Sequence, residues 1–160
     1  MTDDPFASPE LETFWGYIAN SLDRLVEVGG SLDPDGLHWR PPAPDANSVA
    51  ILIGHTLSNA EGNLLGVLAG AAVKRDRDAE FAEGEGTGAD LVEHWRGLRS
   101  RFETVLARLD AGELTRQRPH PQRGSVNGRE VLIVVARHAA EHMGQAELTR
   151  DLWLAGRSTT

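Results

Sequence analysis

The amino-acid sequence predicts an all-α fold, a four-helix bundle that occupies residues 1–160 as a single domain. Apolar residues recur every three or four positions in four long segments, which is the spacing of one buried helix face. No segment shows the apolar–polar alternation of a convincing strand. The connections are rich in proline, glycine or charged residues, which interrupt regular structure. Four long amphipathic helices bury their apolar faces by packing as a bundle.

The first helix is expected to begin at Pro9 and to end at the Gly29-Gly30 pair. Ser8 is a favourable N-cap, and proline suits the first helical position because its missing N–H is not needed there. Two glycines in succession favour the end of a helix. The apolar face of this helix consists of Leu11, Trp15, Ile18, Leu22 and Leu25.

The second helix is expected from about Ser48 to Ala72, and the third from about Thr87 to Leu109. Residues 31–47 contain four prolines and are expected to be irregular. The charged and glycine-rich residues 74–88 predict a solvated loop between the two helices. The third helix has the clearest apolar face, formed by Leu91, Trp95, Leu98, Phe102, Val105 and Leu109.

The fourth helix is expected to follow an irregular connection over residues 110–126 and to end at Gly156. Asn127 can cap its N-terminus while Glu130 reaches back, as in a capping box. Its first half, VLIVVA, resembles a buried strand, but the apolar character continues well past strand length. The helix is apolar on more than one side, so it is expected to be the most buried helix or to face a second subunit. The long connections leave the topology open.

The composition excludes several classes of function. The formal net charge of −8 argues against a nucleic-acid partner, because phosphate neutralisation requires a basic face. The absence of cysteine excludes disulfides, thiolate zinc sites and cysteine nucleophiles. No apolar run approaches the roughly 20 residues that span a membrane, and the acidic N-terminus lacks the features of a signal peptide. We therefore expect a cytoplasmic protein with no membrane and no nucleic acid among its partners.

Two histidines in the fourth helix are the strongest candidates for a functional site. His138 and His142 are four residues apart, so both rings project from one helix face. That face is largely apolar and is expected to point into the bundle. Two buried imidazoles need partners and would repel each other if both were charged, and a shared metal ion meets both needs. Taken alone, such a pair also arises by chance or at the surface.

His55 in the second helix is the third candidate. Its neighbours in the sequence are apolar, and no charged residue is expected beside it. Gly62 and Gly66 lie on the same side of the helix, where they indicate either close helix packing or a cavity. Three neutral histidines would leave coordination positions open for water or a thiol, which is typical of a catalytic metal site. The remaining histidines, expected to be structural or solvated, are His38, His94 and His120.

Two sequence blocks resemble the DinB-like (YfiT-like) superfamily of metal-binding four-helix bundles. One is LHWRPPAPDANSVAILIGH, with W-R-P before the second helix and His55 within it. The other is HAAEHMGQAELTR, with the pattern H-x-x-x-H-x-G-Q. The resemblance implies an up-down-down-up bundle, a homodimer, and a divalent zinc, nickel or iron ion on His55, His138 and His142. Because members include mycothiol-dependent maleylpyruvate isomerase-like proteins, it also implies a low-molecular-weight thiol such as mycothiol as cosubstrate.

The leading functional hypothesis is therefore a divalent-metal-dependent transferase or isomerase. It would present the thiol to a small-molecule electrophile in a cavity beside Gly62 and Gly66. Asn59 and Gln145 share helix faces with the histidines and are candidates to orient a bound ligand. Arg40 is a candidate to meet an anionic substrate, or else anchors its loop to a helix C-terminus.

Glu141 supports one alternative to thiol chemistry, a metal-dependent hydrolase. It completes H-A-A-E-H, which matches the H-x-x-E-H motif of zinc peptidases that use the glutamate as general base. No obvious carboxylate from a following helix is available as the usual third ligand. Glu141 is thus the candidate catalytic residue of a metal-dependent hydrolase, or simply a solvated glutamate. A non-enzymatic metal-binding bundle is the third hypothesis, so the sequence leaves open whether the protein is an enzyme.

Overall fold

The computed structural model describes residues 6, 8–82 and 86–158 of the chain. The acidic N-terminal segment, apart from Phe6 and the residues from Ser8 onward, lies outside the described residues. Among the short elements, η1 is a π-helix and η2 a 3-10 helix. The elements in chain order are α1 (Pro9–Gly30), α2 (Pro34–His38), α3 (Val49–Glu61), η1 (Gly62–Leu68), α4 (Arg77–Glu80), α5 (Gly88–Leu106), η2 (Ala111–Leu114), β1 (Arg118–His120), β2 (Gly124–Val126) and α6 (Gly128–Arg157).

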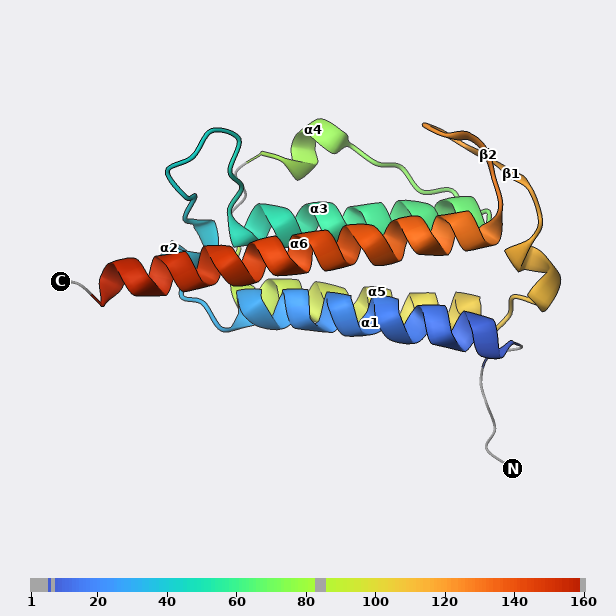
Figure 1. Ribbon diagram of the computed structural model, residues 1–160, viewed down its shortest axis with the longest axis horizontal. Helices are drawn as coiled ribbons and strands as arrows, with labels where there is room; N and C mark the ends of the chain where they lie inside the picture. Colours follow the sequence, from blue (N-terminus) through green and yellow to red (C-terminus); the bar gives the residue numbers. More distant parts are fainter. Residues whose placement is uncertain (1–5, 7, 83–85, 159–160) are drawn as a thin grey trace, which may run out of the picture.

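The four long helices lie side by side as an up-down-down-up bundle (Figure 1). α1 and α6 run in one direction, and α3 and α5 run in the other. This confirms the expected all-α fold. Because α3 and α5 are parallel, the chain between them has to return along the bundle, and Figure 1 shows this connection passing over α3 with α4 in its middle. The described part of this connection, residues 69–82 and 86–87, is called the crossover below, and it covers one face of α3.

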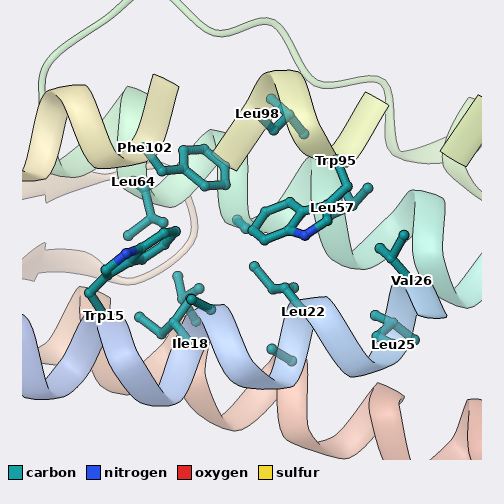
Figure 2. Packing of buried hydrophobic residues seen from close by; sticks show 14 of the residues in the cluster. Trp15, Ile18, Leu22, Leu25, Val26, Leu57, Leu64, Trp95, Leu98 and Phe102 are labelled. Carbon is teal, nitrogen blue, oxygen red and sulfur yellow. The ribbon is translucent and has the colours of Figure 1, made fainter. Parts of the chain in front are cut away.

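The bundle core is made by the apolar faces that the sequence predicted (Figure 2). Trp15 and Leu22 of α1 face Phe102 and Trp95 of α5, and Leu57 of α3 lies beside them. Both tryptophans make edge or tilted ring contacts with Phe102, at centroid distances of 6.2 and 6.1 Å. Burying a side chain of this size stabilises the fold by about 1.5–3 kcal/mol. The core holds α3 and α6 in place. These two helices carry the candidate histidines.

The second long helix differs from the prediction in its last turns. The α-helix ends at Glu61 and continues as the π-helix η1 to Leu68, rather than reaching Ala72. The glycines here lie where the crossover packs closely on the helix. A Cβ on Gly62 would lie 2.6 Å from Arg75 Cδ, and one on Gly66 would lie 3.6 Å from Val73 Cβ. Close packing therefore accounts for Gly62, whereas a Cβ on Gly66 would make only ordinary van der Waals contact; both glycines line a cavity described below.

All three connections contain short elements that the sequence did not predict, and α4 is the one in the crossover. Residues 31–47 include α2, and residues 110–126 include a two-stranded antiparallel sheet in which Arg118 lies opposite Val126. The expectation of no strand was therefore wrong for this hairpin. A strand of three residues is too short to show an alternating pattern in the sequence.

The last helix, α6, is only partly covered. The predicted capping box is confirmed, because the side chains of Asn127 and Glu130 each accept a hydrogen bond from the other residue's backbone N–H. One side of the helix is buried against α1 and α3. Other apolar side chains are 47–61% exposed, namely Ile133, Leu148, Leu152 and Leu154. Within the described residues, no helix combines the length and apolar character needed to cross a membrane.

Candidate metal centre

The three candidate histidines converge from two helices. α3 carries His55, and α6 carries His138 and His142 one turn apart. One ring nitrogen from each residue lies within 4.8 Å of the others, and the ring centroids are 4.4–5.3 Å apart. His55 is buried and the other two are half-buried. The rings thus surround one shared space inside the bundle rather than facing bulk solvent.

Hydrogen bonds determine which nitrogen of His55 and of His142 keeps a free lone pair. His55 donates from Nδ1 to Glu80 Oε2 over 2.9 Å, because a carboxylate can only accept, so its Nε2 keeps a lone pair. His142 Nδ1 lies 2.7 Å from Gln145 Oε1 and donates to it in the same way. His138 Nε2 lies 3.0 Å from His55 Nε2, while the buried Nδ1 of His138 has no hydrogen-bond partner among the described residues.

These nitrogens fit a divalent transition-metal ion. Nitrogens bonded to one ion at about 2.0–2.1 Å lie within about 4.2 Å of each other, so small ring rotations would bring the three into range. Burial lowers the pKa of His55, and burial together with the neighbouring His142 and His55 lowers the pKa of His138 to about 3. Both rings are therefore neutral at pH 7 and can offer lone pairs. Three imidazoles suit zinc, nickel or iron and leave positions open for a further ligand.

Glu80 of α4 is the residue that sequence reasoning missed. Its side chain is only 7% exposed and accepts from His55, from Ser58 Oγ at 2.5 Å, and from Arg75 Nε and Nη2 at 2.9 and 2.7 Å. Burial opposes its ionisation, but the hydrogen bonds from Arg75, Ser58 and His55 prevail and lower its pKa to about 2. Glu80 is therefore an anion that orients His55, as carboxylates commonly do behind metal-ligating histidines.

This contact corrects two expectations from the sequence. Residues 83–85 of the expected loop 74–88 lie outside the described residues, but residues 74–82 are not simply a solvated loop, and His55 does have a charged neighbour. Glu80 lies 25 residues beyond His55, so no helical spacing links them. The available signal was Phe81, a large apolar residue in a charged stretch, which is half-buried with its ring centroid 4.6 Å from that of His55. An apolar side chain there indicates that the crossover docks on α3.

The other candidate residues lie in different places. Gln145 is exposed and orients His142 rather than pointing to the shared space. Asn59 is half-buried one turn after His55. Glu141 is exposed on α6. Arg40 is exposed in the loop after α2, next to Trp39, whose ring packs against Trp153 of α6 at 5.7 Å.

Two cavities lie beyond the histidines, next to η1. The larger, of about 770 Å³, is lined by Gly62 and Gly66 together with several residues between Val105, in the last turn of α5, and Pro121. The smaller, of about 350 Å³, is lined by Asn59 and Val134, which are one helical turn from His55 and His138 respectively. No histidine of the candidate metal centre lines either cavity, but of the two the smaller has lining residues within one helical turn of His55 and His138.

Comparison with known proteins agrees with this architecture. A family model described as the DinB superfamily matches residues 17–146. Among solved structures, the chain is similar to one titled as a conserved protein of a locus from Enterococcus faecalis, with a TM-score of 0.69 and 15% sequence identity. The similarity covers 90% of this chain and 96% of that chain. At this identity the likeness shows the fold alone. No protein of curated function matches.

Proposed function

The chain belongs to the DinB superfamily, and on this premise we propose that it is a divalent-metal-dependent enzyme, a transferase or isomerase that uses a low-molecular-weight thiol such as mycothiol. One observation carries the proposal. Three imidazoles from α3 and α6 converge, two of them with their hydrogens committed to Glu80 and Gln145. Such a set would hold zinc, nickel or iron and still accept an exchangeable ligand.

A bound divalent ion would supply one thing, a lowered pKa for the thiol sulfur, so that the nucleophilic thiolate forms at neutral pH. The protein residues do the rest. Glu80 keeps the hydrogen of His55 on Nδ1, and Gln145 does the same for His142, so their Nε2 atoms stay available. Asn59, one turn after His55, lines the smaller cavity, where it can orient the electrophile. Residues of the crossover cover this side of α3 and limit the access of water.

Elemental analysis of protein purified without a histidine tag tests the metal centre. We expect about one equivalent of a divalent metal in the wild type and a loss of most of it in His138→Ala. His94→Ala is the matched control, because His94 is exposed on α5 and lies outside the cluster. Equal metal content in the wild type and His138→Ala would contradict the proposal.

Glu141→Gln distinguishes thiol chemistry from the hydrolase alternative. Glu141 is the residue that the H-x-x-E-H pattern offers as general base. If the protein transfers a thiol, Glu141→Gln should retain most activity with mycothiol and an electrophile. If hydrolysis is the reaction, this variant should lose it. Tight metal binding without turnover of any thiol–electrophile pair would instead favour the non-enzymatic metal-binding bundle.

We further propose that the protein is a homodimer that uses the exposed side of α6. Leu148 and Leu152 are one turn apart on this side and are 61% and 47% exposed. Light scattering should give a dimer for the wild type and a monomer for Leu148→Asp, and a monomeric wild type would refute this. The cytoplasmic location stays a prediction from the sequence.

A further inference from the structure

The smaller cavity has a charge opposite to that of the protein as a whole. It lies between α3, η1, α6, the crossover and the β1–β2 hairpin, which Figure 1 shows on the same side of the bundle. The chain has 24 acidic residues and a net charge of −8, yet no aspartate or glutamate lines this cavity. Its charged lining residues are Arg75, Arg77 and Arg123. The cavity is therefore a local site of positive potential.

Two of these arginines have no carboxylate partner within the described residues. Arg75 is neutralised by its bidentate contact with Glu80. Arg77 at the start of α4 instead lies 6.0 Å from the ring centroid of Phe81, and Arg123 lies in the turn between β1 and β2. Most other arginines that the structure describes are ion-paired, as Arg24 is with Glu147. An arginine fork without a protein carboxylate matches a carboxylate or phosphate ligand.

A chain of hydrogen bonds among the uncharged lining residues leaves one donor of Asn59 for a ligand. The backbone N–H of Gln122 donates to His120 Nδ1 over 3.0 Å, so His120 donates from Nε2 to Asn63 Oδ1 over 3.2 Å. Asn63 in turn donates from Nδ2 to Asn59 Oδ1 over 3.2 Å. The acceptor of Asn59 is thus committed, and its Nδ2 has no partner among the described residues. Within this chain of hydrogen bonds, the amide Nδ2 of Asn59 is therefore the donor left for a bound anion.

We propose that this cavity, called the anion pocket below, binds a carboxylate or phosphate group of the substrate between Arg77 and Arg123, with Asn59 as a further donor. This rests on the proposed function, because the pocket begins one helical turn from His55 and His138. The substrate class is then a small anionic electrophile, whose acidic group lies in the pocket and whose reactive carbon faces the metal centre. A volume of about 350 Å³ suits a small metabolite.

Binding of simple anions tests the pocket without the metal. In the His138→Ala background, where an anion has no complete metal site to occupy, we would titrate inorganic phosphate and acetate separately while recording backbone amide shifts of the β1–β2 turn. We expect Arg77→Gln combined with Arg123→Gln to weaken binding at least tenfold. Arg108→Gln is the matched control, since Arg108 is exposed, has no ion-pair partner in the described chain and lines the larger cavity instead. The two probes distinguish a phosphate site from a carboxylate site.

The proposal is overturned if neither anion shifts these amides, or if Arg108→Gln weakens binding as much as the double variant. Metal-stripped wild type, titrated in the same way, controls for any structural effect of the His138 substitution. If the elemental analysis finds no metal but the anions still bind, the pocket stands and the enzymatic proposal fails.

Kinetics with the metal-loaded enzyme provide an independent measurement. For an electrophile that carries a carboxylate, the double arginine variant should raise KM at least tenfold, while KM for its methyl ester should change less than twofold. An equal rise for acid and ester would contradict charge recognition in the anion pocket.

Discussion

Replacement of Glu80 tests how far the crossover controls the metal centre. Both carboxylate oxygens are used: Oε2 accepts from His55 and Arg75, and Oε1 accepts from Ser58 and Arg75. Glu80→Gln turns one oxygen into a donor, and the amide can keep its oxygen toward His55 only by placing its NH₂ against Ser58 and Arg75. Glu80→Ala removes every contact and leaves Nδ1 of His55 without its acceptor.

The expected loss of metal affinity follows from these contacts. Loss of a group that orients a metal-ligating histidine typically weakens metal binding 10–100-fold, or about 1.4–2.8 kcal/mol. Because Glu80→Gln can preserve the contact with His55, we expect this variant to bind metal about tenfold more weakly than the wild type, and Glu80→Ala to bind it nearer 100-fold more weakly. Competition with a chromophoric chelator measures both affinities. Glu61→Gln is the control, because Glu61 pairs with Arg101 at the surface rather than with a histidine.

An unchanged metal affinity in Glu80→Ala would refute the orienting role. Thermal unfolding of the metal-free variants keeps this conclusion separate from misfolding. If the metal-free Glu80→Ala protein melts cooperatively and still binds metal as tightly as the wild type, His55 does not need the carboxylate.

Three further predictions follow from the structure. Gly88→Ala should lower the free energy of unfolding, measured in urea, by about 1–3 kcal/mol, because the new Cβ would lie 2.4 Å from the carbonyl oxygen of Gly29. Gly97→Ala is the control: a Cβ there has nothing within 4 Å, so this variant should be neutral or stabilise the protein by about 0.5–1 kcal/mol. Equal effects of the two substitutions would contradict this prediction. Burial and, second, the charge of Arg123 lower the pKa of His120, so its protonation destabilises the folded state as the pH falls below about 6.5. In an NMR titration, Arg123→Gln should move the titration midpoint of His120 toward 6.5 without reaching it, because burial remains. An unmoved midpoint would exclude the charge effect. Chelation of a metal held at about 100 times its Kd should remove about 2.7 kcal/mol and lower the Tm by roughly 5–10 °C, with no shift in a variant that lacks a histidine ligand.

Local signals in the sequence predicted the helical framework. The face from Leu11 to Leu25, the N-cap Ser8 and the capping box at Asn127 each depend on residues within a few positions of one another, and the structure confirms them. The sequence also predicted that His55 converges with the histidines of α6, because helical periodicity determines which positions face into the bundle.

The contacts that the sequence did not predict are those that the connections between the long helices make with the bundle. Glu80 reaches His55 only because the crossover returns over α3, and His120 reaches Asn63 only because the β1–β2 hairpin folds over η1. The close approach of Arg75 to Gly62, at the start of the π-helix η1, is likewise a contact between the crossover and the helix that no helical spacing predicts. Periodicity carries no information about such contacts.

The parallel arrangement of α3 and α5 has a consequence for anyone who redesigns this protein. Rewiring the four long helices with short hairpins would keep every apolar stripe and all three imidazoles, and by the usual criteria of bundle design it would look like an improvement. It would also delete the crossover, and with it Glu80, which orients His55, and Arg77, which we propose binds the anionic group of the substrate. Connectivity, as much as the histidines themselves, specifies this centre.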